Sequence, residues 1–147
     1  MNVFMLLIPK MDCCVLRDTD TLRQGLEKMR HHGYTALPVI TQDGRFAGCV
    51  NEGDFLWHLL QHGGDIRAQE QYLVRDILRT DLNPAVKSTV TMDELLERAT
   101  TQNFIPVVDD RDCLCGIITR RRIMRAMLVE RNFVPPAIET ETPIYLN

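Results

Sequence analysis

The chain has 147 residues and a formal net charge of −3, with 45 % hydrophobic and 25 % charged residues. This balance is ordinary for a globular protein and argues against general nucleic-acid binding, which needs a basic face. No apolar run approaches the ~18 residues of a membrane span. The apolar opening, residues 1–8, lacks the basic start and the cleavage site of a signal peptide. We therefore expect a cytoplasmic protein with no membrane span and no nucleic-acid partner.

The first half of the chain has the pattern of a strand, a helix, two strands and a second helix. Residues 13–17 form a short apolar run, and Thr21 opens a capping box that predicts a helix start. Apolar residues follow with helical spacing until Gly33, which ends the helix. Two strand-like runs then flank Asp43-Gly44, a hairpin signal, and the second helix follows them.

The second half repeats this order. Thr91 opens another capping box, residues 105–108 and 114–118 are strand-like, and a final helix covers about residues 120–130. In each half a proline lies ten residues before a glycine. We interpret these coincidences as an internal duplication of a β-α-β-β-α unit. The paired positions are Pro38 and Gly48 in the first half, and Pro106 and Gly116 in the second.

The duplication divides the chain into three parts. Residues 1–66 hold the first repeat with an N-terminal segment, residues 67–131 hold the second repeat, and residues 132–147 form a tail. Near the joint, residues 62–81 are predicted to be partly helical, and residues 71–78 have one apolar side, suited to docking a helix across the joint. The tail contains three prolines and cannot be one continuous helix, so it is either disordered or an extended arm on a partner.

The stretch with the clearest chemical meaning is residues 116–123, GIITRRRI. It indicates a buried strand that turns into a helix, with Thr119 at or next to the N-cap. Helix N-termini attract anions, and arginine can grip phosphate with two hydrogen bonds. The stretch therefore predicts a phosphate site, although a solvated arginine face is the alternative. Consecutive helical residues point in different directions, so Arg120 and Arg121 are favoured over Arg122.

Residues 48–55 echo this stretch 68 positions earlier. Asn51 takes the place of Thr119, and the carboxylate of Asp54 takes the place of Arg122. Asp54 can simply stabilise the helix start, because a negative charge in the first turn complements the helix dipole.

The two stretches resemble the motif of the cystathionine-β-synthase (CBS) domain, which is glycine, two apolar residues, Thr or Ser, two variable residues, Asp and an apolar residue. Residues 34–39 and 104–107 resemble the central strand of that family. The likeness covers about residues 10–131. It implies an α+β fold, with two pseudo-symmetric β-α-β-β-α CBS repeats packed as one CBS-pair module. The chain looks most like small stand-alone CBS-pair proteins of Gram-positive bacteria.

The resemblance implies that an adenine nucleotide, namely AMP, ATP or cyclic di-AMP, binds in clefts between the repeats. In such pairs the motif aspartate holds the ribose hydroxyls, the Thr or Ser contacts phosphate, and strand residues before the proline cover the base. Arg122 has no hydrogen-bond acceptor for a ribose hydroxyl, so we expect unequal clefts and about one AMP site per chain. The expected nucleotide-binding residues are Cys14, Tyr34, Thr35, Ala36, Pro38, Asn51, Asp54, Phe104, Ile105, Pro106, Thr119, Arg120, Arg121 and Arg122.

The leading hypothesis is a non-enzymatic nucleotide sensor that needs no metal or other cofactor and regulates a separate protein. We also expect a homodimer, because the apolar helix surfaces exceed what one small core needs. One alternative is a structural dimerisation module with empty clefts. The helix residues expected at the dimer surface are Phe55, Trp57, Leu59, Met124, Met127 and Leu128.

The cysteines raise a second alternative, a small enzyme with a thiol nucleophile. Cys13, Cys14 and Cys49 are the candidates, but no convincing base lies near any of them in the sequence. The five cysteines are odd in number, and their spacing fits neither a disulfide framework nor a metal knuckle. We expect small, buried, reduced thiols and no metal site.

Overall fold

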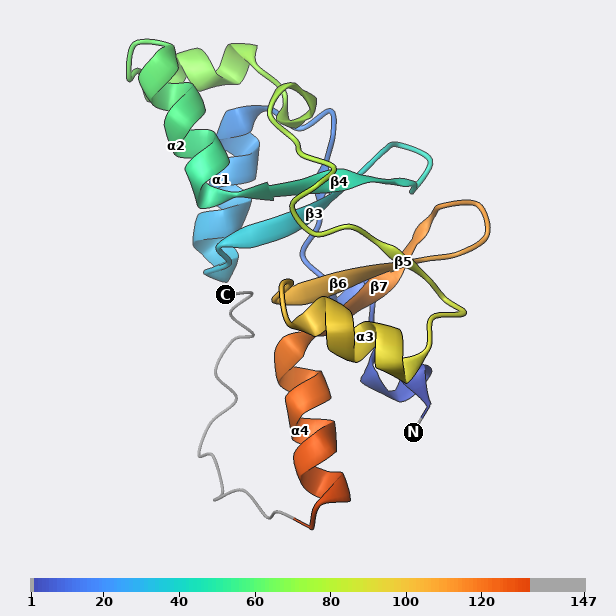
Figure 1. Ribbon diagram of the computed structural model, residues 1–147. Helices are drawn as coiled ribbons and strands as arrows, with labels where there is room; N and C mark the ends of the chain where they lie inside the picture. The colour runs from blue at the N-terminus through green and yellow to red at the C-terminus, as the bar shows by residue number, and fades with distance from the viewer. Residues whose placement is uncertain (1, 133–147) are drawn as a thin grey trace.

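The computed structural model describes residues 2–132 and shows two equivalent units, each with a small sheet and two helices (Figure 1). The helices of the two units lie at opposite ends of the molecule, and the two sheets lie between them. This mixed α+β arrangement confirms the predicted duplication. Most of the predicted tail, residues 133–147, lies outside the described part of the chain.

The first repeat has a three-stranded sheet in the order β2-β3-β4. Strand β2 (Leu16–Arg17) runs parallel to β3 (Ala36–Ile40), which pairs antiparallel with β4 (Phe46–Asn51) across the predicted hairpin. Helices α1 (Leu22–His32) and α2 (Glu52–Gln61) complete the unit. All five residues of β3 are buried, so β3 is the centre of this half of the core.

The second repeat has the same connectivity. Strand β5 (Val86–Lys87) runs parallel to β6 (Phe104–Val108), and β6 pairs antiparallel with β7 (Leu114–Thr119). Helices α3 (Met92–Ala99) and α4 (Arg120–Glu130) follow the predicted positions. Strand β6 is also buried at every residue, like its counterpart in the first repeat.

The N-terminal segment lies against the second repeat, although it precedes the first in the chain. A short 3₁₀ helix (Val3–Leu6), strand β1 (Ile8–Pro9) and a further 3₁₀ turn (Lys10–Asp12) form this segment. Strand β1 pairs antiparallel with β7, so the second sheet has the order β1-β7-β6-β5. A Cβ atom added at Gly116 would lie 2.1 Å from the carbonyl oxygen of Ile8. The motif glycine is therefore needed for this close approach.

The segment between the repeats makes the same kind of contact with the first repeat. Arg79 pairs with Cys49 of β4 through two backbone hydrogen bonds of 2.8 and 2.9 Å. A Cβ atom at Gly48, which has a φ of 150°, would lie 2.5 Å from the carbonyl oxygen of Arg79. The partly helical character predicted for residues 62–81 is confirmed, but without an α-helix across the joint. The chain forms only 3₁₀ turns here, Ile66–Gln71 and Val74–Asp76, because it must become extended to reach β4.

Helix caps set where α1 and α3 begin. Thr21 forms a complete capping box with Gln24, as the sequence predicts. The box at Thr91 is only half formed. The Thr91 hydroxyl accepts a hydrogen bond from the backbone amide of Glu94, but the Glu94 carboxylate contacts Arg98 instead of the Thr91 amide. Each cap of this kind stabilises its helix by about 1 kcal/mol.

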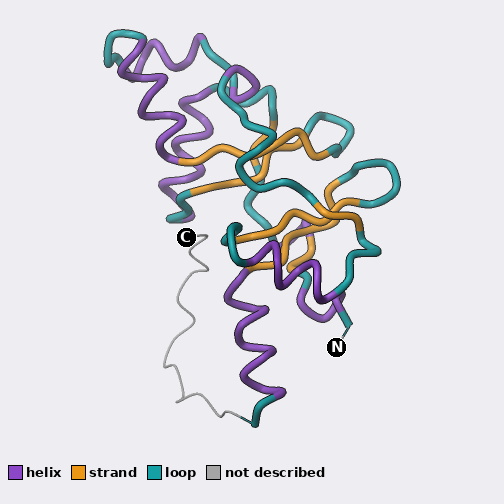
Figure 2. Tube along the Cα trace, in the orientation of Figure 1, coloured by secondary structure: helices purple, strands orange, loops and turns teal. Residues whose placement is uncertain are grey.

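The two sheets are separate, but the hairpin tips of the two repeats lie side by side and are bonded to each other (Figure 2). Arg45 and Cys113 form an isolated antiparallel bridge. The amide of Phe46 donates to the carbonyl of Asp112 at 2.9 Å, and the amide of Leu114 donates to that of Gly44 at 3.0 Å. These bonds fix the two repeats relative to each other.

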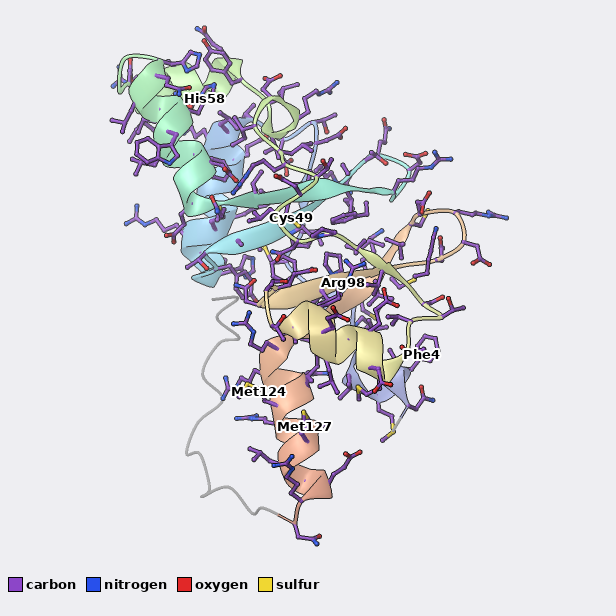
Figure 3. All side chains as sticks on the ribbon, viewed as in Figure 1. Phe4, Cys49, His58, Arg98, Met124 and Met127 are labelled. Carbon is purple, nitrogen blue, oxygen red and sulfur yellow. The ribbon has the colours of Figure 1, made fainter. Side chains whose placement is uncertain are left out.

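The outward faces of α2 and α4 carry exposed apolar side chains. Among the residues predicted for a dimer surface, Trp57, Met124 and Leu128 are exposed, whereas Phe55 is buried in the core. Leu59 and Met127 are partly buried, and Met124 and Met127 are labelled on α4 in Figure 3. No helix between residues 2 and 132 is long and apolar enough to cross a membrane. The exposed apolar residues on these two helices are Leu56, Trp57, Leu60, Met124, Leu128 and Val129.

Candidate functional site

A cavity of about 370 Å³ lies between the two repeats. The first repeat supplies the start of β3 and the turn from β4 into α2. The second repeat supplies the segments before β5 and β6 and the first residue of α4. The lining residues are Thr35, Ala36, Asn51, Glu52, Gly53, Leu82, Asn83, Thr101, Asn103 and Arg120.

Two helix N-termini meet at this cavity because equivalent turns of the two repeats contribute to it. The Asn51 side chain caps α2 by accepting from the amide of Asp54 at 2.9 Å. Thr119 caps α4 by accepting from the amide of Arg122 at 3.2 Å, as the sequence predicts. The backbone amide of the first residue of each helix donates to a backbone carbonyl. The next backbone amide of α2 is that of Gly53, and Gly53 lines the cavity. Both helix dipoles therefore favour a negative charge here.

Arg120 is the arginine that the structure brings to the cavity. Its Nε donates to the carbonyl of Ala99 at 2.7 Å, which fixes the guanidinium at the end of α3. It forms no ion pair with any residue between 2 and 132. Glu52 occupies the equivalent position in the first repeat, 68 residues earlier, and lines the same cavity. The cavity wall thus carries one positive and one negative side chain.

The other two arginines of the motif have different surroundings. Arg121 is exposed and does not line the cavity. Arg122 donates from Nη1 to the carbonyl of Leu7 at 3.3 Å, so it holds the N-terminal segment. One of the three consecutive arginines is therefore placed to meet a ligand in this cavity.

Asp54 stabilises the start of α2, which is one of the two roles expected for it, the other being a contact with ribose. Its Oδ2 accepts from the Asn51 amide at 2.9 Å, which completes a capping box. Its Oδ1 lies 3.0 Å from Nε of Arg79, although no aligned hydrogen bond joins these atoms. Asp54 does not line the cavity, so a ribose contact stays a prediction. Asp54 contacts Arg79, and Arg122 contacts Leu7. These two partners belong to the two chain segments that cross the motif glycines.

The remaining predicted residues do not line this cavity. Cys14 and Tyr34 pack against the core of the first repeat, where burial raises the pKa of both side chains. The others are buried in or at the end of the central strands, and these are Pro38, Phe104, Ile105, Pro106 and Thr119. Of the fourteen predicted residues, the cavity gathers Thr35, Ala36, Asn51 and Arg120.

Sequence reasoning missed six lining residues. Two of them carried a usable signal, because Glu52 is the repeat equivalent of Arg120 and Asn103 is the equivalent of Thr35. Gly53 follows Glu52 directly in the first motif. No local pattern marks Leu82, Asn83 or Thr101, which come from connecting segments.

The three candidate thiols do not have the properties of an activated nucleophile. Burial raises the pKa of Cys13 to about 11 and that of Cys49 to about 12. Burial also raises the pKa of Cys14. A nucleophilic cysteine needs the opposite shift, toward the thiolate. No group of three or more potential metal ligands lies together within the described residues.

Comparison with known proteins identifies relatives of both repeats. The family model for the CBS domain matches residues 8–61 and 74–129. The crystal structure of CbpB in complex with c-di-AMP is similar, with a TM-score of 0.83 and 21 % identity over 90 % of this chain and 87 % of that one. CBSX2, a CBS-pair protein from Arabidopsis thaliana, has been solved in complex with AMP. It is 25 % identical, with a TM-score of 0.69 over 88 % of this chain and 98 % of that one.

Curated relatives are longer than this chain. An uncharacterized protein of Methanocaldococcus jannaschii is 27 % identical over 123 residues, which are 75 % of this chain and 44 % of that protein. A homoserine O-acetyltransferase of Methanohalophilus mahii is 30 % identical over 108 residues, which are only 21 % of its length. The chain therefore spans less than half of the curated relatives it matches.

Proposed function

The chain belongs to the CBS domain family, and on that basis we propose that it is a regulatory protein that binds an adenine nucleotide between its repeats. The observation that carries the proposal is the position of Arg120, at a cavity where two helix N-termini meet. An arginine and oriented backbone amides together favour a phosphate group. The AMP complex of CBSX2 supports an adenine nucleotide as the occupant.

AMP is the ligand that fits these features best. The cavity volume of about 370 Å³ lies near the lower end of the ~300–1,000 Å³ usual for small-molecule sites, which favours a mononucleotide over a cyclic dinucleotide. In the proposed complex the phosphate contacts Arg120 and the amide of Gly53. Glu52 adds a negative charge that opposes further phosphate groups. We therefore rank AMP above ATP and cyclic di-AMP.

Calorimetric titration of the full chain with AMP, ATP and cyclic di-AMP tests this function. We expect AMP to bind with about one site per chain. We expect Arg120→Ala to weaken AMP binding about 10- to 100-fold, because a hydrogen bond to a charged group contributes about 1.5–3 kcal/mol. Adenosine, which lacks the phosphate, should lose much less.

Arg121→Ala is the matched control, because it removes the same charge from the next residue, which does not line the cavity. Arg120 also bonds to Ala99, so thermal unfolding of both variants must show that the fold is retained. Equal weakening of AMP and adenosine, or equal effects of the two substitutions, would contradict the proposed phosphate site. No heat with any nucleotide would leave the structural dimerisation module as the better explanation.

We further propose that the protein acts as a homodimer through α2 and α4. Leu56 and Leu60 of α2 are the repeat equivalents of Met124 and Leu128 of α4, and all four are exposed. Such paired apolar faces suit a second copy of the same chain. The five free thiols support a reducing compartment such as the cytoplasm.

A further inference from the structure

A second cavity, of about 640 Å³ and here called the outer cavity, lies where the N-terminal segment meets the first repeat. It is bounded by the turn after β1, by β2 and α1, and by the loop between β3 and β4. Three cationic side chains line it, Lys10, Arg17 and Lys28, together with the apolar side chains of Met11 and Val15. This concentration of positive charge is a local exception in a chain with a net charge of −3.

Two of these three cations have no ion-pair partner among the residues that the structure describes. Lys28 forms an ion pair with Asp20 at 3.0 Å. The cavity also contains Asp43, but its carboxylate accepts from the Thr41 hydroxyl and faces Arg45 at 3.6 Å. Neither Lys10 nor Arg17 forms a side-chain ion pair with any residue between 2 and 132.

The second repeat shows what the first one lacks. Arg17 is opposite Ile40 in the first sheet, and Lys87 is opposite Val108 in the second, so Arg17 and Lys87 are equivalent. Lys87 forms an ion pair with Asp112 of its own hairpin loop. Position 44 is the counterpart of position 112 and has a similar positive φ, but it is a glycine. The first repeat has therefore kept the cation and lacks the carboxylate.

We propose that this cavity binds an acidic peptide segment of a partner protein, whose carboxylate takes the place that Asp112 has in the second repeat. The partner carboxylate contacts Arg17 and Lys10, and a neighbouring apolar side chain packs on Met11 and Val15. Met11 is 88 % exposed, which leaves apolar surface beside the charges for such a contact. The mixed wall favours a peptide over a free inorganic anion, which makes no use of apolar surface. The proposal rests on the proposed function in one respect, that a regulatory protein contacts a second protein.

The test uses the ¹⁵N-labelled full chain and a capped peptide of alternating glutamate and leucine, with the glutamine–leucine peptide as the neutral probe. We expect saturable shifts of the amide signals of residues 10–17 and 40–44 with the acidic peptide only. Arg17→Gln should weaken this binding at least fivefold. Gly44→Asp should weaken it similarly, because it supplies the missing carboxylate within the chain. Arg30→Gln, an exposed arginine of α1 outside the cavity, should leave it unchanged.

Three results would overturn the proposal. They are no saturable shift at millimolar peptide, equal effects of Arg17→Gln and Arg30→Gln, and tighter Arg17-dependent binding of pyrophosphate than of the peptide, which would make this a phosphate site. AMP titration of the same variants keeps the two proposals separate. The Arg17→Gln variant should bind AMP like the wild type. Loss of peptide binding with intact AMP binding would show that the peptide binds in the outer cavity and not at the AMP site.

Discussion

Replacing Gly116 with alanine should detach β1 from the second sheet. The new Cβ atom would lie 2.1 Å from the carbonyl oxygen of Ile8 and 3.0 Å from its carbonyl carbon. Both are backbone atoms, so a side-chain rotation cannot relieve the clash. The N-terminal segment must move, and with it the pairing of Ile8 with Ile117.

The cost follows from what β1 contributes. Ile8 is only 5 % exposed, and burying such a side chain is worth about 1.5–3 kcal/mol. One or two lost backbone hydrogen bonds add about 0.5–1.5 kcal/mol each. We therefore expect Gly116→Ala to lower the free energy of unfolding by about 3–5 kcal/mol, a large share of the ~5–15 kcal/mol typical of a domain.

Urea unfolding followed by circular dichroism measures this loss, and hydrogen exchange locates it. Amide protection should fall at Ile8 and Ile117 while the first repeat stays protected. Gly53→Ala is the control, because its Cβ would meet only side-chain atoms, the nearest being Asn51 Oδ1 at 3.3 Å. It should change the stability by less than about 1 kcal/mol. A Gly116→Ala variant with wild-type stability and intact protection at Ile8 would refute the reasoning.

Three further predictions follow from the cavity, the exposed helices and the thiols. Glu52→Gln should improve binding of ATP about fivefold more than that of AMP in calorimetry, since it removes a charge that opposes the extra phosphates. An equal change for both would place Glu52 away from the phosphates. The ligand-free protein should sediment near 34 kDa, twice the 16.9 kDa chain, and Met124→Glu should yield monomers. A monomeric wild type would contradict the dimer surface. Because burial raises the pKa of Cys13 from 9 to about 11, Cys13 should have about 100-fold less thiolate at pH 8 than a free cysteine. Its reaction with iodoacetamide should be correspondingly slow, and the rate should rise about tenfold per pH unit until the pH reaches the pKa. Labelling at the free-cysteine rate would show that its burial does not raise the pKa.

The sequence predicted the parts of the fold that depend on near neighbours. The capping box at Thr21 and the hairpin at Asp43-Gly44 are four- and two-residue signals, and both form as expected. Strand β1 and the contact of Arg79 with β4 could not be predicted, because each is a short extended segment whose partner lies far along the chain. The sequence motif identified the two glycines, but only the structure shows why they are required, which is that a backbone segment crosses each of them closely.

The candidate site was predictable only in part for the same reason. The turn at Thr119 was expected, and the cap formed there. Which arginine faces the cavity depends on tertiary contacts, since the carbonyls of Ala99 and Leu7 hold Arg120 and Arg122 in different places. Adding the repeat offset of 68 to the first motif would have suggested Glu52 as the counterpart of Arg120.

The crossing of β1 to β7 also affects how the protein is made. Ile8 pairs with Ile117, which is synthesised 109 residues later. At ~5–20 residues per second, this interval is roughly 5–20 seconds. Throughout it the apolar side chains of the N-terminal segment lack the sheet that buries Leu6 and Ile8 in the finished protein. The first repeat can form its own hairpin during synthesis, but β1 can complete the second sheet only after β7 has been synthesised.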